Sequence, residues 1–277
     1  MSIHSFRIAN TTDHSQQIPA LRCFLNAETL LDLPVGSSWP RLTGPDALAY
    51  LREVGFEGVQ MGQAMWGDAW AEHCHAAGLA TAGAGAVRLP VEADTVVQQQ
   101  QAAGHVATTL HVGWGLEDDA TVDGLVAAVL NASVRYTHPV YVELHRSTIT
   151  QDMWRTVQLT KRFPGIRFNG DFSHYYTGQE MPYGGLDRKL DFLAPVFSRV
   201  RFLHGRIGNA CCMQIDVGDG YTGTDRAYGA TDFMDDYRQI WTRAMRGFLA
   251  TAGAGDYLIF APEILSGAHY YARKFRA

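Results

Sequence analysis

The chain has 277 residues, of which 47% are hydrophobic and 18% are charged, so it can fold around a large core. This composition excludes a disordered tail, a coiled coil and a small disulfide-stabilised domain. With 28 acidic against 23 basic residues the formal charge is −5, which disfavours binding to the phosphate backbone of nucleic acids.

The sequence carries no signal for export or for membrane insertion. Its four cysteines show neither CxxC spacing nor a regular framework, which is typical of thiols in a reducing compartment: Cys23, Cys74, Cys211 and Cys212. The N-terminal segment has no basic start followed by an apolar run, and the longest apolar stretches are too short to span a bilayer. We therefore expect a soluble, cytoplasmic protein with no membrane partner.

Short apolar runs alternate with helical patterns through most of the chain. Each run is unbroken, as is typical of strands in a parallel sheet that helices cover. Eight runs are predicted to be strands, in chain order 22–26, 58–61, 80–84, 108–112, 140–145, 166–171, 200–205 and 257–263.

The segments between these runs show helical periodicity. Leu48, Leu51 and Val54 share one face of a helix that ends at Gly55. Three further apolar stripes are predicted, over 122–130, 186–197 and 233–248. Eight strand–helix units in one chain predict an α/β fold, a single (β/α)₈ TIM barrel over 1–277, before a doubly wound sheet.

Three segments depart from this alternation. Residues 1–19 precede the first predicted strand as an N-terminal extension. Residues 207–229 are rich in Gly, Asp, Cys and Thr and are too long for an ordinary connection, which predicts a long lid or substrate loop after the seventh strand. Only residues 264–277 follow the last strand, so we expect the eighth helix to be short or irregular.

Polar side chains lie at the ends of the last four predicted strands. In a (β/α)₈ barrel the C-terminal ends of the strands carry the catalytic residues. The polar side chains here are Glu143 and His145, Asp171 and His174, His204 and Arg206, and finally Glu263. Three carboxylates packed together repel one another unless a cation compensates. Oxygen donors with one imidazole suit a hard or borderline divalent ion. We therefore predict one divalent metal ion at this end, Mn²⁺ or Mg²⁺ in the first place, with Co²⁺ or Zn²⁺ as alternatives.

These strand ends resemble those of the xylose isomerase-like barrels, which include sugar isomerases and epimerases and relatives of endonuclease IV. The resemblance runs from about residue 20 to 265, on GFEGVQ (55–60), VELHRST (142–148), GDFSHYY (170–176), FLHGRIG (202–208) and APEIL (261–265). It implies that the metal ligands are Glu143, Asp171, His204 and Glu263. It also implies that His174 contacts substrate hydroxyls and that Arg206 helps to hold the substrate.

Three further residues are predicted to bind substrate. His111 ends the fourth strand, Trp114 follows it, and Gln60 ends the second strand where many relatives place Glu. His145 lies just beyond the strand end and is expected either behind the residues that contact metal and substrate or at the rim of the site. Because no strand-end glycine loop lies beside a Lys/Arg cluster, a non-phosphorylated sugar, inositol derivative or glycoside is favoured over a sugar phosphate.

The predicted activity is that of an isomerase or epimerase of a sugar or keto-sugar. A metal ion that chelates a carbonyl and the neighbouring hydroxyl stabilises the enediolate formed when a proton is lost. By resemblance, Glu143 and Glu263 act as catalytic bases on opposite faces of that plane. Return of the proton to the same carbon gives epimerisation, and return to the adjacent carbon gives isomerisation.

Other activities stay open. A metal-dependent lyase or dehydratase acting on a keto-inositol or glycoside would use the same site. An endonuclease of abasic DNA is disfavoured by the negative charge and by the single certain strand-end histidine ligand. A barrel that binds metal without catalysis would not need two opposed carboxylates. The expected partner is a small carbohydrate or cyclitol rather than nucleic acid, and a homo-oligomer is possible.

Overall fold

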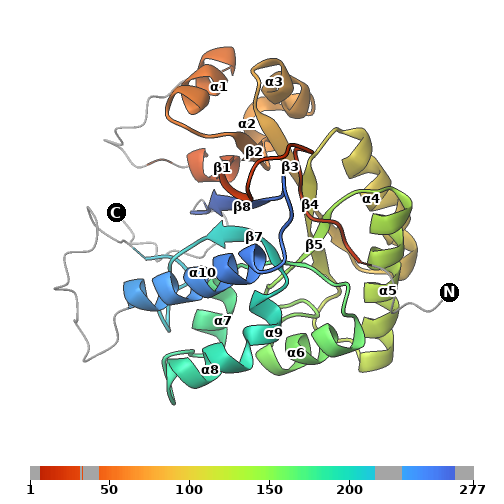
Figure 1. Ribbon diagram of the computed structural model, residues 1–277, viewed down its shortest axis with the longest axis vertical. Helices are drawn as coiled ribbons and strands as arrows, with labels where there is room; N and C mark the ends of the chain where they lie inside the picture. The colour runs from red at the N-terminus through yellow and green to blue at the C-terminus, as the bar shows by residue number, and fades with distance from the viewer. Residues whose placement is uncertain (1–6, 32, 34–43, 216–232, 266–277) are drawn as a thin grey trace, which may run out of the picture.

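The computed structural model describes residues 7–31, 33, 44–215 and 233–265 (Figure 1). Its eight strands are β1 (Ala20–Asn26), β2 (Gly58–Gln60), β3 (Ala80–Val87), β4 (Ala107–Val112), β5 (Val140–Glu143), β6 (Phe168–Asn169), β7 (Val200–Gly205) and β8 (Tyr257–Pro262). They form a closed barrel in sequence order, every neighbouring pair is parallel, and β8 pairs with β1. The predicted (β/α)₈ barrel is therefore confirmed.

Helices surround this barrel, with α1 to α3 gathered on one side of it and α6 to α9 on the opposite side (Figure 1). The helices are α1 (Gly44–Glu53), α2 (Gln63–Trp66), α3 (Trp70–Ala76), α4 (Ala93–Ala102), α5 (Asp119–Arg135), α6 (Met153–Arg162), α7 (Ser173–Gly178), α8 (Leu186–Phe192), α9 (Ala194–Phe197) and α10 (Phe233–Leu249). Two short 3₁₀ helices, η2 (Ala27–Leu30) and η3 (Pro90–Glu92), follow β1 and β3.

Helix α5 shows how local sequence produces these elements. The Asp118 carboxylate accepts a hydrogen bond from the backbone N–H of Thr121, 2.8 Å away, and so caps the first turn. The predicted apolar stripe of this helix is buried completely or almost so: Val122, Leu125, Val126, Val129 and Leu130. Burying each such side chain contributes about 1.5–3 kcal/mol, which attaches α5 firmly to the barrel.

Two helical patterns differ from their prediction. Val54 is exposed rather than buried, because α1 ends at Glu53 and Gly55 turns the chain away with a φ of 98°. The stripe over 186–197 forms two short helices, α8 and α9, instead of one. Pro195 lies in the first turn of α9, and because proline lacks an N–H it starts a helix better than it continues one.

Four strands end earlier than predicted at the functional end of the barrel, β2 and β8 by one residue and β5 and β6 by two. Strand β5 ends at Glu143, and β6 covers only Phe168 and Asn169, where its register with β7 shifts. As a result His145 and Asp171 lie in the turns that follow these strands rather than in the strands themselves. Turn positions leave their side chains free to approach residues from other strands.

The predicted N-terminal extension takes part in the barrel. Ile8 is fully buried and donates its backbone N–H to the carbonyl of Gly165 over 3.1 Å, while Thr12 forms a bridge with Asp256 next to β8.

Most of the predicted 207–229 loop, from residue 216 onward, and residues 266–277, where a short last helix is expected, lie outside the described residues. In the described parts of the chain, no helix has the length and apolar character needed to cross a bilayer.

Candidate functional site

Most of the side chains predicted from the strand ends line one cavity of about 400 Å³ at the C-terminal end of the barrel, whereas Asp171 and His174 are not among its lining residues. Its lining includes His111, Glu143, His145, His204, Arg206 and Glu263. The four predicted metal ligands are at most 5% exposed. A cluster of carboxyl groups so far from water requires compensation by positive charge.

The donor atoms fit a divalent cation. Glu143, Asp171 and His204 each offer a ligand atom within 4.8 Å of the other two. The Nδ1 atom of His204 lies 3.7 Å from Glu143 Oε1, 3.8 Å from Asp171 Oδ2 and 3.3 Å from Glu263 Oε2. One imidazole nitrogen surrounded by three carboxylates is a donor set that Mn²⁺, Mg²⁺ and their neighbours accept.

Arg206 lies among these carboxylates, and it is 2% exposed. Its Nη2 atom donates to Asp171 Oδ2 at 2.5 Å and also to Glu263 Oε2. Burial opposes ionisation of Asp171, but the guanidinium holds the pKa of this carboxyl well below its usual range. The structure thus places the residue predicted to hold substrate in direct contact with two predicted metal ligands.

The two predicted catalytic carboxyls differ in acidity. Burial opposes ionisation of Glu143, yet His111 and His204 hold its pKa below the ordinary value. At Glu263 burial prevails and raises the pKa, although Arg206 and His204 act in the opposite direction. Burial also disfavours the charged form of His204, but Glu263 and Glu143 raise its pKa to about 9. The site therefore combines an ionised carboxylate with a carboxyl that retains its proton more readily.

Three histidine rings lie in a row beside the carboxylates. The ring centroids of His111 and His145 are 4.2 Å apart, and those of His145 and His174 are 3.7 Å apart. At the ends of this row, His111 Nε2 is 3.1 Å from Glu143 Oε1 and His174 Nε2 is 3.4 Å from Asp171 Oδ2. Burial and the two neighbouring imidazoles lower the pKa of His145 to about 3, so it is neutral near pH 7. Of the two positions expected for His145, the structure places it behind neighbouring site residues, between the rings of His111 and His174, rather than at the rim.

Two amides that sequence reasoning missed orient the predicted catalytic carboxyls. Asn26 ends β1 and donates its Nδ2 to Glu263 Oε1 at 2.9 Å. Asn169 ends β6 and donates its Nδ2 to Glu143 Oε2 at 3.0 Å. Both amides are fully buried. The available signal was an Asn directly after two apolar residues or one, in Phe-Leu-Asn at 24–26 and Phe-Asn at 168–169, near the end of a predicted strand.

The remaining two predicted substrate residues lie in different surroundings. Gln60 is fully buried at the end of β2, and both ends of its amide contact other side chains, those of His204 and Thr109. Trp114 is 59% exposed after β4, with the guanidinium of Arg88 over its ring at 4.1 Å. Trp114 therefore lies at the rim, away from the carboxylates, and it is not part of the cavity lining.

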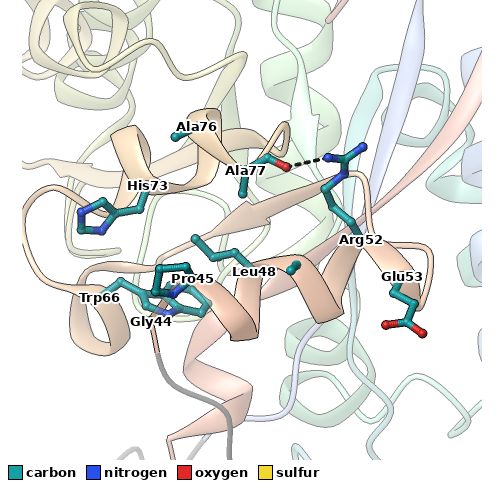
Figure 2. A pocket seen from close by; sticks show the side chains of 10 residues that line it. Gly44, Pro45, Leu48, Arg52, Glu53, Trp66, His73, Ala76 and Ala77 are labelled. Carbon is teal, nitrogen blue, oxygen red and sulfur yellow. Dashed lines mark hydrogen bonds between the residues drawn. The ribbon is translucent and has the colours of Figure 1, made fainter.

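A larger cavity, of about 760 Å³, lies outside the barrel between α1, α2 and α3 (Figure 2). Its floor is apolar around Leu48, and Arg52 at its edge donates to the carbonyl of Ala77 over 2.9 Å. His73 and Glu53 lie at opposite ends of the groove, so no acid–base pair forms there (Figure 2). The chemistry-bearing groups are at the barrel mouth, as expected for this fold.

No protein-family model matches the sequence, and no curated protein matches it significantly. Solved structures do match. A probable 3-DHS dehydratase from Bacillus anthracis has a TM-score of 0.55 at 14% identity, over 92% of this chain and 96% of its own.

An L-ribulose 3-epimerase has a TM-score of 0.51 at 13% identity, over 90% of this chain and 84% of its own. A xylose isomerase domain protein from Planctomyces limnophilus has a TM-score of 0.50 at 15% identity, over 92% of each chain. This chain therefore has the fold of the xylose isomerase-like barrels, as the motif resemblance implied.

Proposed function

We propose that this protein is a divalent-metal-dependent isomerase or epimerase of a sugar or keto-sugar, acting by proton abstraction next to a carbonyl. One observation carries the proposal: Glu143, Asp171, His204 and Glu263 converge, buried, from the ends of four consecutive strands. When bound among them, a divalent ion supplies Lewis-acid polarisation of the substrate carbonyl.

The two glutamates divide the proton transfers. Glu143 accepts the substrate proton, because its low pKa keeps it ionised and Asn169 fixes one of its oxygens. Glu263 holds a proton more readily and returns it to the substrate from the other side, with Asn26 fixing its orientation. Environments that push the pKa values of two carboxyls apart are typical of acid–base pairs.

The cavity suits a small neutral carbohydrate or cyclitol. A volume of about 400 Å³ lies in the range of small-molecule sites. Among the described residues that line it, Arg206 is the one with a permanent positive charge, and this charge is engaged by Asp171 and Glu263. A phosphate group would have to displace these carboxylates, so the proposed substrate is not phosphorylated.

A lyase is the second candidate, since one protein of similar fold is a probable 3-DHS dehydratase. On a keto-inositol or glycoside, the same abstraction by Glu143 would be followed by expulsion of the group β to the carbonyl. Glu263, which retains its proton more readily, would then protonate the leaving oxygen. The two candidates share every step up to the loss of the first proton.

The test is turnover in D₂O. Protein loaded with Mn²⁺ is incubated with a panel of keto-sugars and keto-inositols, and products are analysed by NMR and mass spectrometry. Incorporation of one carbon-bound deuterium without loss of water or aglycone supports the isomerase or epimerase. Loss of water or aglycone supports the lyase. A metal-saturated protein that catalyses no exchange with any member of the panel contradicts both.

Matched variants assign the roles. Glu143→Gln is expected to reduce deuterium incorporation by about 10²–10⁴-fold, because it removes the base. Glu263→Gln is expected to slow product formation more than exchange at the first carbon, because it removes the group that returns the proton. Glu53→Gln makes the same change on the exposed end of α1 and should have no effect. Near wild-type turnover in either site variant would contradict the two-carboxyl mechanism.

A further inference from the structure

Gln60 makes a buried bridge across the inside of the barrel. It ends β2 and is fully buried, although its strand is distant from β7 in the barrel order. Its Oε1 atom lies 3.0 Å from His204 Nε2, and its Nε2 atom donates to Thr109 Oγ1 at 3.0 Å. The amide nitrogen is thus used by Thr109, and the amide oxygen is left for the histidine.

This contact determines which nitrogen of His204 keeps its hydrogen when the ring gives up a proton to bind metal. An amide oxygen only accepts hydrogen bonds, so the nitrogen that faces it, Nε2, must be protonated. Without metal, the carboxyl groups around His204 favour the charged ring, which carries hydrogen on both nitrogens. A ring that binds a metal ion is neutral and carries a single N–H, so with hydrogen kept on Nε2 the lone pair is on Nδ1. This Nδ1 is the atom that lies 3.3 Å from Glu263 Oε2 and faces Glu143 and Asp171 at 3.7 and 3.8 Å.

The amide of Asn169, which also lies beside His204, does not distinguish the two nitrogens of the ring. Asn169 Nδ2 lies 3.2 Å from His204 Nδ1 and 3.3 Å from Nε2, so it approaches both nitrogens of the ring almost equally. Its shortest hydrogen bond goes to Glu143 Oε2 at 3.0 Å. Gln60 is therefore the contact that distinguishes the two ends of the imidazole.

We infer that Gln60 is a positioning residue that holds His204 in the tautomer whose Nδ1 binds a divalent ion. This inference rests on the proposed function, and it gives Gln60 a role that acts through His204 rather than through substrate. Partners that orient a metal-binding histidine in this way commonly contribute about 10–100-fold to metal affinity.

Calorimetric titration with Mn²⁺ at one fixed pH tests the inference. Gln60→Leu removes the acceptor and is expected to weaken Mn²⁺ binding by about 10–100-fold. Gln60→Glu keeps an acceptor at the same place and is expected to bind Mn²⁺ as tightly as wild type. Thr108→Val is the matched control, because it removes a buried hydroxyl from the residue next to Thr109 that bonds His138 instead, at 2.8 Å.

A second measurement on wild-type protein does not depend on any variant folding. Long-range ¹H–¹⁵N spectra of the Zn²⁺-loaded protein are expected to show His204 bound to metal through Nδ1 and carrying hydrogen on Nε2. Metal bound through Nε2 overturns the inference, and so does wild-type Mn²⁺ affinity in Gln60→Leu or an equal loss in Gln60→Glu. Wild-type protein that binds no divalent ion removes the proposed function as well, whereas failure of the Gln60 results alone removes only this inference.

Discussion

Replacing Arg206 with Met is expected to make the stability of the protein depend on metal. Arg206 is buried and donates to both Asp171 and Glu263. Without it, His204 is the remaining basic group of the described site that lies within 4 Å of all three carboxyls, Asp171, Glu263 and Glu143. Met keeps the length and apolar body of the side chain, so the change removes the charge more than the volume.

The magnitude follows from the burial of the pair. Removing one partner of a buried ion pair costs about 3–5 kcal/mol, because the other partner is left charged away from water. In a chain of this size each kcal/mol lowers the unfolding midpoint by roughly 2–4 °C, so we expect a decrease of roughly 6–20 °C. A divalent ion at about a thousand times its dissociation constant stabilises any protein that binds it by about 4 kcal/mol. Wild type gains this too, so the deficit of the variant shrinks by about 1.4 kcal/mol for each tenfold by which loss of the Arg206 charge tightens Mn²⁺ binding.

Thermal unfolding in EDTA and in excess Mn²⁺ measures both effects. Arg201→Met is the control, because Arg201 is equally buried but lies at the opposite end of β7, bonded to Asn10, Thr251 and backbone carbonyls. Its loss of stability should be the same with and without metal. If the Arg206 variant unfolds at the wild-type temperature in EDTA, or if Mn²⁺ does not reduce its deficit, the assigned charge compensation is wrong.

Three further changes test other parts of the structure. Asn26→Ala leaves a buried oxygen of Glu263 without its donor, and urea unfolding should show a loss of about 1–3 kcal/mol; an unchanged midpoint would contradict this. Burial lowers the pKa of His138 from 6.5 to about 4. Between these two pH values the unfolded chain binds a proton at His138 that the folded chain does not bind. The free energy of unfolding should therefore be unaffected by this group above pH 6.5 and should fall between pH 6.5 and 4. His138 should contribute about 3 kcal/mol to this fall, so His138→Gln should lose about that much less stability than wild type over the same range, in which His145 still contributes. Equal pH slopes for the two proteins would refute it. Trp114→Ala removes only an exposed contact with Arg88 and should cost less than about 1 kcal/mol in thermal unfolding, so a larger loss would show that the indole is packed.

The barrel was predictable because its signals are local. An apolar run followed by an apolar helical stripe needs only a few consecutive residues to be recognised, and all eight predicted strands have a counterpart in the structure. Boundaries were harder to predict. Strand β6 contains two residues instead of the six from 166 to 171, because a register shift between neighbouring strands depends on both strands together.

The sequence by itself determined the order of the elements and the kinds of side chain delivered to the barrel mouth. Only the closed barrel decided which of them touch. Asn26 and Glu263 are 237 positions apart, and Gln60 and His204 are 144 apart, yet each pair forms a hydrogen bond. The same holds for Arg206, whose pairing with Asp171 and Glu263 joins three strand ends. Such contacts depend on barrel closure and strand register, which bring distant residues together in ways that no local periodicity encodes.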